Sequence, residues 1–463
     1  MVHTRRGVYI GIHIFFITLL MVPNTLFYAT PNALSELLIT TFKDPDLIHT
    51  SSLMHSIPSI FMSFFTSFVA DMFGVQYFLI PYQVVICFGC LLIAFASNNV
   101  MFLIGRLMYG ITGEGMIMLQ SKLIANLVPS QWHPTAFGAA FSGFMFGEFL
   151  TSFFISRLTT VRTAYLVCFG CLLISLICCS AYTAIEIVRL RKLQEKEGST
   201  ERKRATCKEL FKRQIDAIRA APTVLWLFIV VRLIFLGSKM AFDSTSTLTL
   251  TSALNVPEDR VVFCVGIQQL TSAISFLITG LLTSFHRSGP MIAILIGFLI
   301  MLLGMISLYI FSGFESGRTF TTAICVTVFL GLSFGTFAGN ASSVIVALSS
   351  VYIAATGLGI VFSLQFILMS GIVPLSNYVA KKLGSRNICW LYIGILIVAI
   401  PFLVISAIVY FRKVFSTSKS EMDLDTKMND SYMDPQPDTS IISQRSAEMS
   451  TALGDSNRVS AQL

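Results

Sequence analysis

Two charged side chains stand inside one apolar stretch of the chain. Arg106 and Glu114 flank Gly110 at intervals of four residues, so a helix would carry all three near one face, with the glycine leaving room between the charges. A charged side chain at bilayer depth costs about 2.5–3.5 kcal/mol on insertion scales, so it persists mainly where it faces a cavity or a partner. This pair can bind the two ends of a zwitterion, form a proton-sensitive pair, or make an ion pair that packs helices together.

The apolar stretch 223–250 carries three more charged residues. Arg232, Lys239 and Asp243 are spaced by seven and four residues, which again places them on one helical face. The spacing predicts a second set of intramembrane charges. Lys239 and Asp243 can contact a substrate, or they can pair with each other within the helix.

Other polar side chains also fall inside apolar stretches. Glu148 is an intramembrane acid, and we expect it to act with Glu114 in proton coupling. Tyr28 and Asn340 can bind a substrate through hydrogen bonds. Hydrogen bonds between neighbouring helices are an equal alternative for such residues.

The composition indicates which elements must position these residues. Of the 463 residues, 54% are hydrophobic and 12% are charged, 40 are Phe, and the mean hydropathy is +0.76. These values are typical of a polytopic membrane protein, embedded in a lipid bilayer. The net charge of +8 does not indicate nucleic-acid binding, because the basic residues gather mostly in one connector between apolar runs.

Apolar windows long enough to cross a bilayer, about 20 helical residues each, recur along the first 412 positions. We therefore predict an all-α protein with twelve transmembrane helices. The predicted spans are 8–33, 50–73, 77–97, 101–127, 134–159, 163–188, 223–250, 260–285, 289–312, 320–347, 352–380 and 388–411.

A long basic link divides the chain into two sets of six spans. Between Arg189 and Arg219 there are eleven Lys and Arg against five acidic residues, and such basic flanks favour the cytoplasm. Both termini are then cytoplasmic. We favour a solvated spacer for this link over an amphipathic surface helix around Glu209 to Ile218. The predicted parts are a bundle over 1–188, the linker 189–221, a second bundle over 222–412 and a disordered cytoplasmic tail over 413–463.

No signature of catalysis appears in the sequence. It has no phosphate-binding glycine-rich loop, no metal-spaced set of His and Cys, and no nucleophile elbow. We expect a protein that is not an enzyme, with no catalytic residues, no metal and no cofactor; a proton gradient is its one candidate source of energy.

The two halves share local sequence. The segment T-A-F-G-A-A-F-S at 135–142 matches T-G-L-G-I-V-F-S at 356–363, with Thr, Gly, Phe and Ser in register. Tyr109 and Gly110 align with Phe334 and Gly335. Internal repeats of this kind are common in transporters, whose binding sites lie between the repeats.

The six-plus-six arrangement resembles the major facilitator superfamily. The segment 68–74, F-V-A-D-M-F-G, is similar to the superfamily's G-x-x-x-D-x-x-G loop, with Asp71 and Gly74 at the matching positions. The resemblance implies that these two residues form a gating loop on the cytoplasmic side. It also implies a central cavity between the bundles, across which Glu114 and Lys239 approach each other.

Within that superfamily, G-R-x-x-Y-G-I-x-G-E at 105–114 resembles the lysosomal dipeptide transporter-like branch, which implies that Glu114 belongs to a substrate pocket. Where that branch has an arginine thought to hold a substrate carboxylate, this chain has Met145.

These observations predict a transporter that works by alternating access. The expected solute is small and polar or zwitterionic, with an amino acid or short peptide favoured and a monocarboxylate or sugar as alternatives. The transport can be uniport or proton-coupled symport. The alternative class is a non-transporting membrane scaffold or sensor with the same fold. The expected location is the plasma membrane or a lysosomal or endosomal membrane, and an accessory membrane protein is an optional partner.

Overall fold

The computed structural model describes residues 2–196, 207–314, 319–349 and 353–432. All regular structure in these segments is helical. Twelve of the helices there are long and apolar enough to cross a membrane. The prediction of an all-α polytopic protein with twelve membrane spans is therefore confirmed.

The first half of the chain contains six spanning helices, a short helix α2 and three 3-10 turns. Their bounds are α1 Val2–Ala33, α2 Ser35–Phe42, α3 Leu47–Phe73, η1 Val75–Tyr77, α4 Leu79–Ala94, α5 Asn99–Leu127, η2 Ser130–Trp132, α6 His133–Phe153, η3 Ile155–Arg157 and α7 Val161–Lys196.

The second half contains six more spanning helices, preceded by the short helix α8. Their bounds are α8 Cys207–Arg219, α9 Thr223–Leu254, α10 Glu258–Thr283, α11 Gly289–Phe311, α12 Phe320–Leu348, α13 Ala354–Leu383, η5 Ser385–Asn387 and α14 Ile388–Tyr432.

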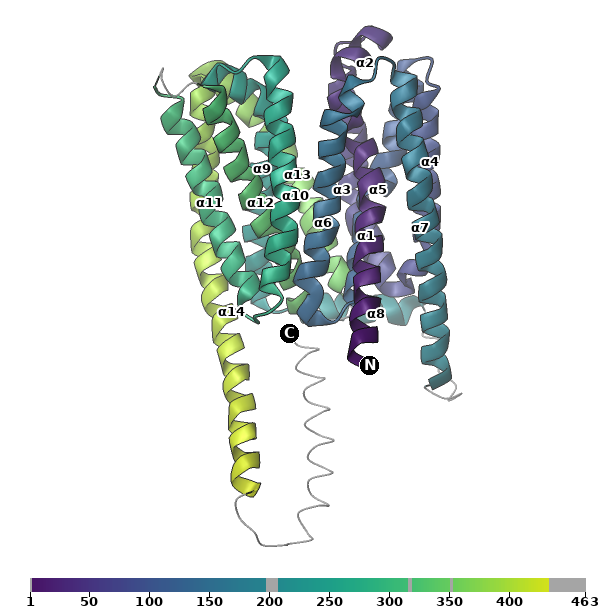
Figure 1. The fold of residues 1–463 in the computed structure, drawn as a ribbon, viewed down its shortest axis with the longest axis vertical. Coiled ribbons are helices and arrows are strands. Elements are labelled where there is room, and N and C mark those ends of the chain that lie inside the picture. The colour runs from purple at the N-terminus through teal and green to yellow at the C-terminus, as the bar shows by residue number, and fades with distance from the viewer. Residues whose placement is uncertain (1, 197–206, 315–318, 350–352, 433–463) are drawn as a thin grey trace.

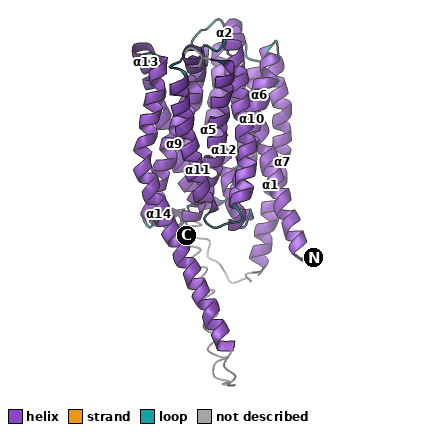
Figure 2. Ribbon diagram, turned by 60° about the vertical axis from the view of Figure 1, so that its left-hand side comes forward, coloured by secondary structure: helices purple, strands orange, loops and turns teal. Residues whose placement is uncertain are grey.

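The helices form two bundles that stand side by side. Figure 1 shows α1 and α3–α7 in one bundle and α9–α14 in the other, with α2 at one end of the molecule and α8 at the other. Figure 2 shows that the long helices run roughly parallel to one another. We call the two ends the α2 side and the α8 side. Successive spans alternate in direction, so α5 runs towards the α8 side, whereas α9 and α13 start there.

Two helix pairs make the most extensive contacts between the bundles: α6 packs against α10, and α3 packs against α13. Small residues bring the α6 and α10 backbones together. A Cβ atom on Gly280 would lie 2.6 Å from the carbonyl oxygen of Pro134 and 3.2 Å from the Cα of Gly138. A methyl group there would push the two bundles apart.

Two segments differ from our expectations. The basic link was expected to be a solvated spacer, but its second part forms α8. The last helix was expected to end at 411, with a disordered tail from 413, but α14 continues to Tyr432. No Gly or Pro follows Arg412 before Pro435, so no residue in that stretch interrupts the helix. The rest of the predicted tail lies outside the described residues.

Candidate functional site

The acid of α5 lies beside a histidine of α3. Glu114 is 6% exposed, and its Oε1 is 3.8 Å from Nε2 of His55. Gly110 makes this approach possible, because a Cβ atom there would lie 2.6 Å from the carbonyl oxygen of His55. The room that we expected the glycine to leave between the two charges of α5 is thus occupied by the α3 backbone.

Aromatic rings surround that histidine. The ring centroid of His55 is 5.1 Å from that of Tyr28, 5.5 Å from that of Tyr109 and 5.9 Å from that of Phe366. Phe366 belongs to α13, so the second bundle completes the group. Phe144 of α6 lies 6.1 Å from Tyr28. We call these five residues the aromatic cluster.

Arg106 is also buried, but it is not paired with Glu114. Its Nη1 donates a hydrogen bond to the backbone oxygen of Tyr28 at 3.4 Å, and its guanidinium lies 5.8 Å from the ring centroid of Tyr109. Its Nε has no hydrogen-bond partner. Eight residues of helix, about 12 Å, separate Arg106 from Glu114. The simple ion pair that packs helices together is therefore not formed by these two residues.

The second set of charges is arranged around Asp243 of α9. Lys239 forms an ion pair with Asp243, which also accepts a hydrogen bond from Nε2 of Gln268 at 2.8 Å. The Lys239 ammonium lies 4.2 Å from the ring centroid of Phe334. The side chain of Lys239 is 4% exposed and that of Asp243 is 35% exposed. The pair within the helix is thus formed, and one of its members remains accessible.

Glu148 connects the two bundles. Its Oε2 accepts a hydrogen bond from Nε2 of Gln269 at 3.2 Å, and Gln269 in turn accepts one from Ser152 at 3.0 Å. Glu148 also interacts electrostatically with Lys239 and Asp243. We expected Glu114 to be the acid that approaches Lys239. In the structure Glu148 is in electrostatic range of Lys239, whereas Glu114 contacts His55.

Tyr28 lies between the two sets of charges. It interacts electrostatically with Glu114, Arg106 and Glu148 of the first bundle and with Asp243 of the second. Together with Lys239, the partner of Asp243, six of the predicted site residues are therefore gathered around one region between the bundles.

Asn340 takes a different place. Its Oδ1 accepts a hydrogen bond from Thr283 at 2.7 Å, and its Nδ2 donates one to the Thr336 oxygen at 2.8 Å. Both ends of the amide are used within the second bundle.

The predicted gating residue Asp71 joins the bundles at the α8 side. Its carboxylate accepts hydrogen bonds from the backbone N–H and the hydroxyl of Thr356, at 2.7 and 2.8 Å, in the first turn of α13. Lys122 of α5 pairs with the same carboxylate at 2.5 Å. Gly74 ends α3 with φ of 98°, a left-handed conformation that favours glycine. These contacts join α3, α5 and α13 at the α8 side, and we call them the seal of the α8 side.

The other interface repeats this arrangement without a charge. Thr135 donates to the Ser284 hydroxyl through its backbone N–H at 3.2 Å, and the two hydroxyl groups lie 2.7 Å apart. Thr135 and Thr356 begin the two segments that match in sequence, so Ser284 takes the place of Asp71. These contacts agree with the predicted internal repeat.

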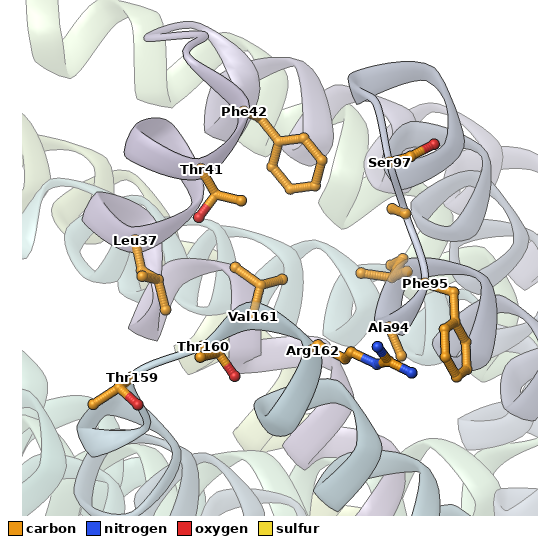
Figure 3. A pocket seen from close by; sticks show the side chains of 12 residues that line it. Leu37, Thr41, Phe42, Ala94, Phe95, Ser97, Thr159, Thr160, Val161 and Arg162 are labelled. Carbon is orange, nitrogen blue, oxygen red and sulfur yellow. The ribbon is translucent and has the colours of Figure 1, made fainter.

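A pocket of about 460 Å³ lies away from this region, towards the α2 side (Figure 3). It is bounded by α2, the end of α4 and the start of α7, and the Arg162 guanidinium lies 4.6 Å from the ring centroid of Phe95. The pocket shares no lining residue with the charged and aromatic groups described above. Among the described residues, no group of three or more His, Cys, Asp or Glu side chains is placed to hold a metal ion.

The chain belongs to the major facilitator superfamily, whose family model matches residues 15–367. Its fold is similar to that of the human organic anion transporter MFSD10 (TETRAN), with a TM-score of 0.65, 13% identity, and coverage of 86% of this chain and 99% of that one. It is also similar to the proton:xylose symporter XylE bound to 6-bromo-6-deoxy-D-glucose, with a TM-score of 0.65, 18% identity, and coverage of 85% and 96%. No curated protein matches the chain by sequence.

The fold is thus that of a membrane transporter that works by alternating access. Both bundles contribute to the region that contains the predicted charges, as expected for a binding site between repeats.

Sequence reasoning missed two residues of this arrangement. His55 was not recognised, although it belongs to a row of polar residues at intervals of four along α3. That row is Ser51, His55, Ser59, Ser63 and Ser67, all of them buried. Such spacing marks one helical face, and it could have identified the histidine. Lys122 of α5 was not matched with Asp71, although it is buried and pairs with that residue.

Proposed function

We propose that this protein transports a small zwitterionic organic solute, an amino acid or a short peptide, through the region between its bundles. The observation that carries the proposal is the division of charge: an acid within the aromatic cluster on the first bundle, and a lysine on the second. Tyr28 interacts electrostatically with charges of both bundles. Such a region offers one binding place for an ammonium group and another for a carboxylate.

Glu114 with the aromatic cluster suits the ammonium end of the solute. A cation is attracted both by a carboxylate and by the faces of aromatic rings, with about 2 kcal/mol or more from the rings when the site is desolvated. In the described ion pairs the Glu114 carboxylate contacts only the His55 imidazole. A substrate ammonium would therefore supply a positively charged partner for this carboxylate.

Lys239 suits the carboxylate end. It is now paired with Asp243, which keeps a second hydrogen-bond donor in Gln268. Asp243 can therefore release or share the lysine without leaving its own charge unpartnered. A bound carboxylate would take over part of the Lys239 ammonium, whose aliphatic stem stays against Phe334.

We further propose that Glu148 couples transport to protons. It is an intramembrane acid at the interface of the bundles, in electrostatic range of Lys239 and Asp243. Glu148→Gln should abolish uptake driven by a pH gradient in proteoliposomes but retain exchange of labelled for unlabelled solute. Glu36→Gln, at an exposed position of α2, is the control. Retained gradient-driven uptake would assign the coupling elsewhere.

A monocarboxylate is the second candidate substrate, because Arg106 and Arg232 are buried cations without an acidic partner in the described ion pairs. The similarity in fold to MFSD10, an organic anion transporter, agrees with this candidate. A sugar, the kind of solute for which the proton:xylose symporter XylE is named, would use the amides of Gln268 and Gln269 instead.

Thermal unfolding of the purified protein with leucine, dileucine, 4-methylpentanoate, leucinamide and xylose separates these candidates. A ligand of the folded state present at 100 times its Kd adds about 2.7 kcal/mol of stability. We expect leucine or dileucine to stabilise, and leucinamide and 4-methylpentanoate to stabilise less, because each lacks one charge. Equal stabilisation by 4-methylpentanoate would favour the monocarboxylate. A protein that binds none of these solutes and acts through its link or tail would be the scaffold or sensor.

We also propose that the α8 side is cytoplasmic, in the plasma membrane or in a lysosomal or endosomal membrane, because the link that contains α8 is rich in Lys and Arg. Protease accessibility of that link in intact and permeabilised cells tests this orientation. We expect cleavage only after permeabilisation, and cleavage in intact cells would place the α8 side outside the cytoplasm.

A further inference from the structure

We propose that Arg232 is a second anion-binding residue, placed between the central charges and the α8 side, where it holds the carboxylate of the solute on its way to or from that side. This inference rests on the proposed function, because it takes the solute to carry a carboxylate. It adds a second anion-binding site along the route of the solute. Neither the family match nor the sequence indicates such a site.

Arg232 is buried without the partners that a buried arginine needs. It is 1% exposed, and it is among the largest fully buried side chains of the protein. Its Nε and Nη1 have no hydrogen-bond partner, and no ion pair to it is found within the described part of the chain. Leaving such donors unpaired in the interior destabilises the protein, and the effect is larger for charged groups. A ligand that accepts these hydrogen bonds would remove that cost.

The position of Arg232 on α9 fits an anion-binding site between Lys239 and the α8 side. It lies seven residues, two helical turns or about 10 Å, before Lys239, and the same face of α9 carries both. Because α9 begins on the α8 side, Arg232 is nearer that side than Lys239 is. A solute that leaves Lys239 towards the α8 side would next meet this guanidinium.

The seal of the α8 side lies next to Arg232. The guanidinium is 5.4 Å from the ring centroid of Phe362 in α13. The following residue, Ser363, accepts a hydrogen bond from the backbone N–H of Phe64 in α3 at 3.1 Å. Separation of α3 from α13 breaks that bond and uncovers this part of α13. Arg232 would therefore become accessible in the conformation that opens to the α8 side.

Another arginine provides a comparison. Arg260 lies 5.4 Å from the ring centroid of Phe320, the same separation as in the Arg232–Phe362 pair, but it is exposed at the start of α10. Its charge is therefore hydrated, and its packing on an aromatic ring needs no further explanation. The burial of Arg232 and its unused donors distinguish the two.

The planar guanidinium favours a planar, two-oxygen anion. A carboxylate can accept two parallel N–H bonds from it, a geometry that the point charge of a lysine does not offer. Propionate is the simplest such probe, and propionamide is a neutral molecule of nearly the same shape. Inorganic phosphate serves as an anion of a different shape.

The test measures propionate binding to the full-length protein in detergent through its unfolding temperature, at constant ionic strength. Lys239→Gln is present throughout, so that the central site does not contribute. We expect stabilisation by propionate but not by propionamide, and an increase of the apparent Kd by about tenfold or more in Arg232→Gln. Arg232→Lys should recover part of the affinity, and Arg260→Gln should retain all of it. Asp71→Asn should increase the affinity, because it weakens the seal of the α8 side; a purely structural arginine predicts no such gain.

Equal binding of propionate with and without Arg232, or equal stabilisation by phosphate, would overturn the proposal. Its failure can be told apart from failure of the proposed function. If Glu114→Gln and Lys239→Ala transport normally while Arg232→Gln no longer binds propionate, the assignment of Glu114 and Lys239 to the solute is wrong, but Arg232 is still an anion-binding residue. The reverse outcome leaves the central site and removes Arg232 from the path.

Discussion

The carboxylate of Glu114 lies 3.8 Å from Nε2 of His55, which the rings of Tyr28, Tyr109 and Phe366 surround. An acid and a base from two helices of one bundle thus meet at a ring contributed by the other bundle. Movement of the bundles relative to each other would change the surroundings of this pair. That makes the pair suited to sense which side of the membrane is open.

His55→Phe keeps an aromatic ring at this position but removes the nitrogen beside Glu114. We expect the KM for the transported solute to rise by up to about tenfold, because the imidazole nitrogen that lies 3.8 Å from the Glu114 carboxylate would no longer help to position that carboxylate. His49→Phe, at an exposed position of the same helix, should leave uptake unchanged. An unaltered KM in His55→Phe would show that the ring alone matters.

Asp71→Asn should open the α8 side. The substitution removes the charge that pairs with Lys122 and weakens the bonds to Thr356, while the equivalent contact of Thr135 with Ser284 has no charge to lose. A cysteine introduced by Ser363→Cys, with the native cysteines replaced, should react faster with a water-soluble maleimide in Asp71→Asn.

Ser284→Ala is the matched control for this gate. Its contact is made by two hydroxyl groups and a backbone N–H, so its loss should change the labelling rate of the introduced cysteine much less. Equal acceleration by both substitutions would contradict a special role for the charged interface.

Gly110→Ala should destabilise the protein by about 1–3 kcal/mol, a cost typical of overpacking. The added methyl group would lie 2.6 Å from the carbonyl oxygen of His55 and would separate α3 from α5. Gly170→Ala, on the exposed face of α7 with no atom within 4 Å of the added carbon, should not destabilise. Thermal unfolding in detergent compares the two; equal losses of stability would mean that the close approach of the helices is not needed.

Gln214→Ala should weaken the seal of the α8 side through α8. The Gln214 amide, 3% exposed, donates to the Phe68 oxygen at 3.1 Å and to the Thr356 hydroxyl at 2.9 Å, so that one side chain of α8 contacts both bundles. We expect faster labelling of the cysteine in Ser363→Cys, as for Asp71→Asn. Lys212→Ala, at an exposed position of α8, is the control, and similar rates in both variants would exclude this role.

The twelve spans and their division into two sets could be predicted because each span is a long apolar run, and a bilayer requires a helix of known length. The charges of α5 and α9 could be predicted because such residues are costly there. Their partners could not, because spacing along one helix does not say which neighbouring helix a side chain meets. Lys122 was therefore not matched with Asp71, nor His55 with Glu114.

The link was harder to interpret for another reason. Its many charged residues suggest a solvated segment, yet one residue, Gln214, is buried against Phe68 and Thr356. Composition averaged over a segment does not reveal such a single contact. The contact requires α3 of one bundle and α13 of the other to lie next to each other.

Uptake of labelled leucine or dileucine, whichever stabilises the protein, into proteoliposomes tests the central claim most directly. Glu114→Gln and Lys239→Ala should each abolish uptake while the variants remain folded, and the exposed-site variants Glu36→Gln and Arg260→Gln should transport like the unaltered protein. Near-normal uptake by both Glu114→Gln and Lys239→Ala would contradict the assignment of these two charges to the solute.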